Sequence, residues 1–137
     1  MPDLARQRLT ALRNGLLRLH LALLDSERAA YERDMRRISG TGDYLNLVLN
    51  DPWFSWLREL SQFVVLIDET LDFAEPPTPE EAERLIARAR ALVSPSEEGE
   101  GFGKRYAEVM QRDAGVVLAH GAMVKVFEGL AEGPAVE

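Results

Sequence analysis

The chain of 137 residues contains no cysteine and only two lysines, Lys104 and Lys125. Without cysteine, neither a disulfide nor a thiolate zinc site can form, which suits a reducing compartment such as the cytoplasm. The other basic residues are arginines, and the formal net charge is −7. Because nucleic acids and anionic membranes require a basic surface, this charge argues against either as a partner.

Long apolar runs are also missing. No stretch reaches the roughly 18 uninterrupted apolar residues that a membrane span needs. The first residues lack the basic start and apolar core of a signal peptide. We therefore expect a cytoplasmic protein with no membrane partner. An apolar fraction of 46% and a charged fraction of 28% are ordinary for a globular protein. The length predicts one domain over residues 1–137, with a loose tail at 133–137.

Apolar residues at three- and four-residue steps predict helices throughout the chain. The central helix is expected at 51–74, with Asp51 as its N-cap, Pro52 at its first position and a middle covered on most sides. A long first helix is expected at 3–38, stopped by the glycines of 39–42. A short helical turn follows at 44–49, with Asp43 as its cap.

The second half of the chain carries clearer helix signals. Thr78, Pro79 and Glu81 form a capping box that predicts a helix to about Val93. A brief helix is expected from Phe102, and Asp113 is expected to cap a last helix over 114–130. With no alternating run long enough for a strand, the sequence predicts an all-α, up-and-down four-helix bundle with short accessory helices.

Two motifs suggest ligand binding on first inspection. The glycine-rich segment 99–105 resembles a phosphate-binding loop, but Glu98 and Arg105 occupy positions where that loop needs Gly and Ser or Thr. We interpret it as a linker before the next helix. Trp53 lies on the apolar stripe of the central helix, whereas Trp56 lies on its flank. Trp56 is therefore a candidate for a ligand groove or a subunit contact.

Four ionisable residues tend toward the interior of the predicted bundle: His20, Glu27, Asp68 and His120. Buried charge must be paired, hydrogen-bonded or bound to a metal ion. Paired polar groups in the core are one interpretation, and a mononuclear metal site is the other. A di-iron site is disfavoured, because neither histidine has a Glu three residues before it. No residue is in a context that identifies it as catalytic, and no cofactor is indicated.

The segments 49–57, 67–69 and 96–103 (LNDPWFSWL, IDE and SEEGEGFG) resemble those of an uncharacterised family of short bacterial proteins. The resemblance would extend over most of residues 15–127. It implies a bacterial, cytoplasmic, helical protein, and it implies no activity, cofactor or site residue.

Two functions follow from the sequence. The first is a non-enzymatic bundle that acts through protein contacts, as a homo-oligomer. The first helix outruns its neighbours, so Leu4, Leu9 and Leu12 are expected to be uncovered and to contact a second copy. The second is a metal- or small-ligand-binding bundle, with enzymatic activity left open.

Overall fold

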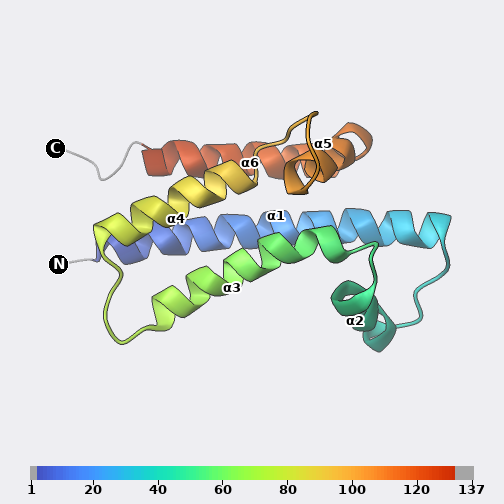
Figure 1. Ribbon diagram of the computed structural model, residues 1–137, viewed down its shortest axis with the longest axis horizontal. Helices are drawn as coiled ribbons and strands as arrows, with labels where there is room; N and C mark the ends of the chain where they lie inside the picture. Colours follow the sequence, from blue (N-terminus) through green and yellow to red (C-terminus); the bar gives the residue numbers. More distant parts are fainter. Residues whose placement is uncertain (1–2, 132–137) are drawn as a thin grey trace.

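The computed structural model describes residues 3–131, and every regular element within them is a helix (Figure 1). The predicted all-α class is therefore confirmed. A 3-10 turn, η1 (Ser55–Leu57), precedes α3. The α-helices are α1 (Leu4–Asp34), α2 (Thr41–Asn50), α3 (Arg58–Asp72), α4 (Pro79–Leu92), α5 (Phe102–Arg112) and α6 (Ala114–Ala131).

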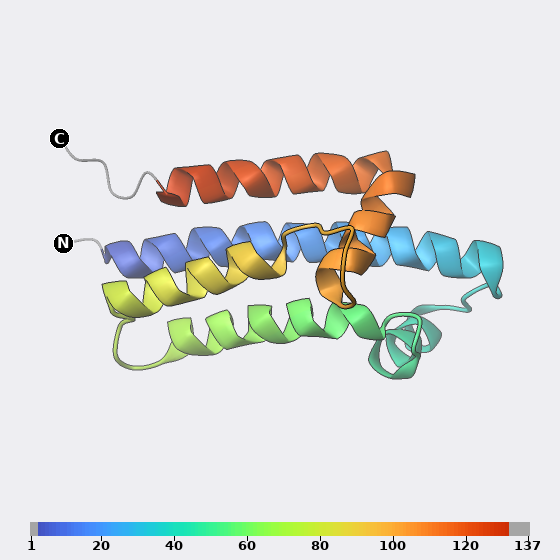
Figure 2. The ribbon, with the colours of Figure 1, turned by 45° about the horizontal axis from the view of Figure 1, so that its top comes forward.

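The central helix of the molecule is α1, and α3, α4 and α6 pack along it (Figures 1 and 2). One stripe of α1 is fully buried by these three helices: Leu9, Leu12, Leu16, Leu19 and Leu23. The prediction that 51–74 is the central helix is wrong. That segment supplies the shorter α3, whose apolar middle is covered on one side only, because Val65 is 51% exposed.

The start of the predicted central helix is instead a tight turn. Asp51 is the C-cap of α2, and its Oδ1 accepts the Trp53 N–H at 2.9 Å. The helix begins only at Arg58. The break has a packing reason, because it lets Phe54 and Leu57, three residues apart, enter two different apolar clusters. A continuous helix would have kept them on one face.

The second apolar cluster closes the far end of α1. Its buried members are Tyr31, Ile38, Leu47 and Phe54, and Trp53 packs against them. The rings of Tyr31 and Trp53 meet edge to face at 5.5 Å, and those of Tyr31 and Phe54 lie at 5.8 Å. Tyr44 of α2 contacts Phe54 at 6.1 Å. The part of α1 that outruns α3 and α6 is thus covered by α2 and this cluster.

The prediction of uncovered positions near the start of the first helix is wrong, because α3, α4 and α6 pack there. Leu9 and Leu12 are fully buried, and Leu4 is 40% exposed. The first helix also ends at Asp34 rather than at residue 38. Gly42 belongs to α2 instead of stopping α1, and only Gly40, with φ of 95°, uses the conformational freedom of glycine there. The prediction that Asp43 caps the next helix is wrong, because Asp43 lies in the first turn of α2 and binds Arg36 and the Ser39 N–H.

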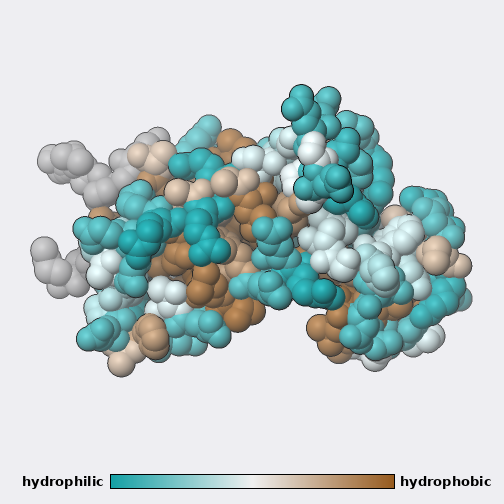
Figure 3. Space-filling model, in the orientation of Figure 1, coloured by the Kyte–Doolittle hydropathy of each residue, from teal (hydrophilic) through white to brown (hydrophobic). Residues whose placement is uncertain are grey.

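The other caps are as predicted. Thr78 and Glu81 form the capping box of α4, and Asp113 Oδ1 accepts the Gly115 N–H at 2.8 Å at the start of α6. Apolar residues interrupt the hydrophilic surface in separate patches, among them patches over the region of α3 and α4 (Figure 3).

Gly15 lies at a tight contact between α1 and α6. A Cβ placed there would lie 3.1 Å from Met123 Sδ and 3.3 Å from Val126 Cγ2. The two helices run antiparallel, because Arg8 Nη2 near the start of α1 donates to the Leu130 carbonyl oxygen near the end of α6 at 2.9 Å. Glycine at position 15 therefore sets how closely α6 approaches α1.

We expect Gly15→Leu to lower the free energy of unfolding by about 1–3 kcal/mol, because the new side chain overpacks against α6. The gain in helix propensity, about 1 kcal/mol, is too small to reverse the sign. Urea denaturation measures the change. Gly129→Leu is the matched control, since a Cβ at Gly129 meets no atom within 4 Å. Equal stability of the two variants would contradict the close contact.

Candidate functional site

Glu27 is the most deeply buried charged residue among those described, and it joins three elements. From α1 its Oε2 accepts the indole N–H of Trp56 in η1 at 2.6 Å. Its Oε1 accepts a hydrogen bond from the guanidinium of Arg112, the last residue of α5. Arg112 is itself partly exposed. The buried carboxylate is thus paired with a cation and a neutral donor, as burial of charge requires.

A continuous row of aromatic rings leads away from this contact. Trp56 meets Phe102 with ring centroids 5.1 Å apart, and Phe102 meets Tyr106 at 5.6 Å. Tyr106 meets His120 of α6 at 5.4 Å. Phe102 and Tyr106 are one turn apart on α5 and are both buried. The short α5 therefore links the Glu27 carboxylate on α1 to the His120 ring on α6.

The contact between Tyr106 and His120 fixes the state of the imidazole. Tyr106 Oη lies 2.7 Å from His120 Nδ1. Burial raises the pKa of the Tyr106 hydroxyl well above its usual value, so it stays protonated. Burial also lowers the pKa of His120, so the ring is neutral at pH 7. The fully buried Tyr106 hydroxyl has no other hydrogen-bond acceptor within residues 3–131, so it donates to Nδ1, and the remaining imidazole proton is on Nε2.

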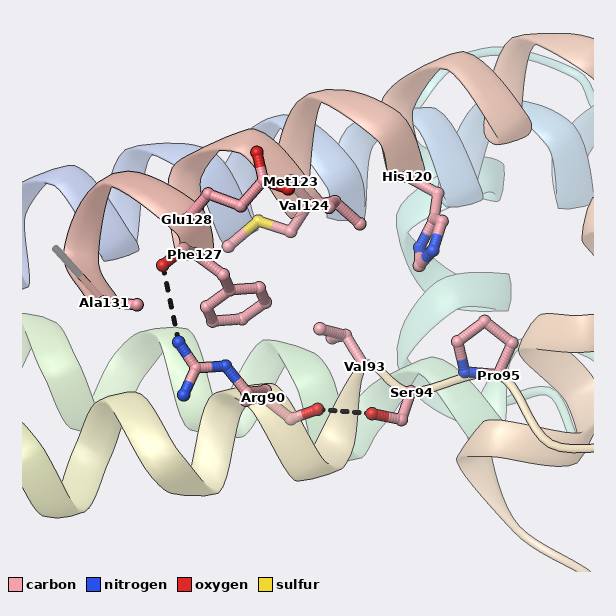
Figure 4. A pocket seen from close by; sticks show the side chains of 10 residues that line it. All are labelled: Arg90, Val93, Ser94, Pro95, His120, Met123, Val124, Phe127, Glu128 and Ala131. Atoms are coloured by element: carbon pink, nitrogen blue, oxygen red, sulfur yellow. Dashed lines mark hydrogen bonds between the residues drawn. The ribbon is translucent and has the colours of Figure 1, made fainter.

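His120 lines a hollow of about 450 Å³ between the end of α4 and α6 (Figure 4). The ring projects from α6 at one end, toward Val93 and Pro95. At the other end Arg90 lies over the Phe127 ring, with its Cζ 5.2 Å from the ring centroid. The wall between the two ends is mostly apolar, formed by Val93, Met123, Val124 and Phe127. Such a hollow suits an apolar molecule with few polar groups.

Trp56, predicted as a groove or interface residue, lines a second hollow of about 490 Å³. The opposite side of this hollow is the segment from Gly99 to Arg105, and the Arg105 Cζ lies 5.7 Å from the Trp56 ring centroid. Phe102 in this segment begins α5, as predicted. The indole N–H of Trp56 donates to Glu27, so only the ring of Trp56 is available to contact a ligand in the hollow.

Three of the four residues predicted as metal ligands are hydrogen-bonded to other partners. Glu27 binds Trp56 and Arg112, and His120 binds Tyr106. Asp68 Oδ1 accepts a hydrogen bond from Arg13 Nε at 2.7 Å. Burial lowers the pKa of His20, and no neighbouring charge offsets the effect. Within residues 3–131, no three His, Asp or Glu side chains form a group suited to one metal ion.

Sequence reasoning missed Tyr106, Arg112 and Arg90 as parts of these sites. Tyr106 does stand on the apolar stripe predicted for the fourth helix, but its hydroxyl partner is 14 residues away. Arg112 pairs with a carboxylate 85 residues earlier, and Arg90 contacts Phe127 across two helices. Pairings this distant leave no periodic signal in one sequence. A tyrosine on a buried stripe is the one available hint, because a buried hydroxyl needs a partner.

We expect Glu27→Leu to lower the free energy of unfolding by about 1–3 kcal/mol, because the Trp56 N–H loses its acceptor. Glu27→Gln keeps an acceptor for Trp56, so its effect should be smaller, about 1 kcal/mol or less. Arg112 can turn to solvent in both variants. Chemical denaturation followed by circular dichroism compares them. The assignment is contradicted if the Gln variant is the less stable of the two.

The histidines also predict how stability depends on pH. The folded-state pKa values of His20 and His120 are lowered, so the unfolded chain takes up protons first as pH falls. Stability should therefore decrease as pH falls from about 6.5, the unfolded value, toward the folded values. Asp43 and Asp113, whose pKa values are also lowered, contribute only in more acidic solution. Urea midpoints at pH 7.5 and 5.5 measure the decrease, and a His20→Gln, His120→Gln double variant should show less of it.

Comparison of the chain with protein-family models, with curated proteins and with solved structures finds no match. The resemblance to short bacterial proteins seen in the segments 49–57, 67–69 and 96–103 therefore stays a prediction. What the protein does must be inferred from the geometry of its own residues. Two features offer that inference: the hollow beside His120, and the surface of the helix that carries His120.

Proposed function

We propose that the protein is a non-enzymatic helical bundle that acts through protein contacts, and that it forms a homodimer through α6. The observation that carries the proposal is how little of this apolar helix is covered. Only four of its 18 residues are buried: Val116, Met123, Phe127 and Leu130. Figure 2 shows α6 along one edge of the molecule, beside α1, with no helix on its outer side.

The outer face of α6 carries the exposed small or apolar residues Ala114, Val117, Leu118, Gly121 and Val124, and the charged Lys125 and Glu128 follow on the same face. Leu118 is 75% exposed, Val117 44% and Val124 39%. These positions recur at three- and four-residue steps, so they form one stripe. A contiguous apolar stripe on a protein surface is typical of an interaction site.

A second copy suits this face because the face complements itself. If two α6 helices cross antiparallel at Gly121, Leu118 of one copy faces Val124 of the other. Glu128 then faces Ala114, at the positive end of the partner helix, where a negative charge is favourable. A Cβ at Gly121 would meet no atom within 4 Å, so the crossing point is open.

The same helix is long and apolar enough, by length and composition alone, to cross a membrane. Its two charged residues, Lys125 and Glu128, lie in its second half. The helix packs on the central α1 through its four buried residues, and the chain carries a net charge of −7. We therefore favour a protein partner and retain the expected bacterial, cytoplasmic setting. The membrane alternative becomes an outcome of the test.

The proposal also includes the architecture. α3 and α6 run antiparallel to α1, as the contacts from Arg6 and Arg13 to α3 and from Arg8 to α6 indicate. The contact of Arg90 with Phe127 supports an antiparallel pairing of α4 with α6. Alternating directions support an up-and-down four-helix bundle of α1, α3, α4 and α6, with α2 and α5 as accessory helices.

We expect multi-angle light scattering to report a dimer for the full chain at tens of micromolar and a monomer for Leu118→Arg. A charge at the centre of the stripe leaves an unpaired, desolvated group in the interface. Leu49→Arg on α2 is the matched control, because Leu49 is 66% exposed and lies outside α6. The Leu49 variant should remain dimeric.

A wild-type monomer at that concentration would overturn self-association. The same holds if Leu49→Arg dissociates the dimer and Leu118→Arg does not. Flotation with neutral phosphatidylcholine vesicles tests the membrane alternative. Wild-type protein that floats with the vesicles, while Leu118→Arg stays in solution, would assign the outer face of α6 to a lipid surface instead.

A further inference from the structure

The hollow beside His120 lies apart from the centre of the outer face of α6 and has its own chemistry. Its walls come from α4, from the residues that follow α4, and from the side of α6 that faces them. Met123, Phe127 and Val93 form a buried apolar floor. Its volume of about 450 Å³ falls within the range of about 300–1,000 Å³ typical of small-molecule sites.

Polar groups lie at the two ends of the hollow. His120 and Phe127 are seven residues apart on α6, so the ends are separated by about 10 Å. At the first end the imidazole offers an Nε2–H donor, because the Tyr106 hydroxyl occupies Nδ1. This donor is held in place, since the Tyr106 side chain is fully buried and packed against Phe102. A preorganised donor favours a ligand with a matching acceptor.

The second end carries balanced charge. Arg90 and Glu128 both line the hollow there, one positive and one negative. Arg90 is already engaged, because its Nη2 donates to the Phe127 carbonyl oxygen at 3.4 Å and its Cζ lies over the Phe127 ring. Neither an anion nor a cation therefore finds a net opposite charge in the hollow, and the chain as a whole is acidic.

From this geometry we infer that the hollow binds a small neutral molecule with an apolar body and a carbonyl head group, such as an amide, ester or lactone. The carbonyl oxygen accepts from His120 Nε2–H. The apolar body extends over Met123 and Phe127 toward Arg90, away from water. His120 here binds the head group and performs no reaction. The hollow shares Val124 and Glu128 with the outer face of α6, but its binding groups all belong to one copy, so binding needs no partner copy.

Octanamide is the probe, and the ε-methyl groups of ¹³C-labelled methionines report where it binds. We expect the Met123 resonance to shift and saturate, because Met123 lines the hollow. Met35, exposed at the end of α1, should not shift. Octanoate and octylamine have a similar chain with opposite charges and should bind at least about tenfold more weakly. Absence of a Met123 shift would overturn the site, and equal binding of octanoate would overturn the neutral ligand class.

Three variants separate the head-group contact from the apolar wall. His120→Phe removes the donor and should weaken octanamide binding about five- to tenfold, whereas His120→Gln keeps an N–H donor and should recover part of the loss. Val124→Phe fills the hollow from a partly exposed position and should abolish the Met123 shift without unfolding the chain. An unchanged shift in Val124→Phe would show that octanamide binds elsewhere, and unchanged affinity in His120→Phe would remove the head-group contact.

Leu118→Arg separates this inference from the proposed function. Leu118 does not line the hollow. The variant should therefore bind octanamide as the wild type does, whatever its oligomeric state. Loss of the Met123 shift in a folded Leu118→Arg variant would show that the hollow exists only in the dimer, and would overturn the independent site.

Discussion

Burial of one leucine stripe on α1 is the constraint on which the rest of the structure depends. Five leucines on that stripe are fully buried, and they are covered from three directions by α3, α4 and α6. A fully buried leucine contributes about 1.5–3 kcal/mol relative to an exposed one, so the five leucines together contribute substantially to stability. Each outer helix is held mainly by the face that it turns to α1. The faces that these helices turn away from α1 contribute less to packing. On α6 that outer face is largely apolar.

The polar contacts are arranged around that core and add to its hold on α5, which joins the core through Phe102, Tyr106 and Val109. α5 contacts η1 and α6 more than it contacts α1, and its position depends on the row of rings from Trp56 to His120. Glu27 anchors one end of this row, and Tyr106 orients the imidazole at the other. A carboxylate that is almost completely buried would be costly without both Trp56 and Arg112. The same contacts that satisfy Glu27 therefore also position α5, and α5 positions His120.

Local signals in the sequence were reliable where one residue decides the outcome. The capping box at Thr78 and the cap at Asp113 predicted helix starts correctly, because a cap acts over three residues. The prediction for 51–57 failed because Asp51 and Pro52 are equally suited to a turn, and the choice was made by packing of Phe54 against Tyr31.

Leu9 and Leu12 were expected to be uncovered because helix length was taken from the sequence alone. No periodicity reveals that α3, α4 and α6 cover Leu9 and Leu12, or that α2 covers the far end of α1. The contacts of His120 and Glu27 join residues 14 to 85 positions apart, which a single sequence does not encode in any local pattern.

Gly121 leaves the outer face of α6 open to close approach by another helix. A glycine within a helix lowers helix stability by about 1 kcal/mol relative to alanine, and Gly121 lies at an exposed position within α6. At Gly15 on α1 the same cost is offset within the molecule, because the side chains of Met123 and Val126 occupy the space where its Cβ would be. At Gly121 no atom lies within 4 Å of the position that a Cβ would take, so packing within one copy gives no reason for glycine there. Two helices that cross at a glycine can approach closely, as α1 and α6 do at Gly15. The comparison within one chain thus supports a second helix, from another copy, on the outer face of α6.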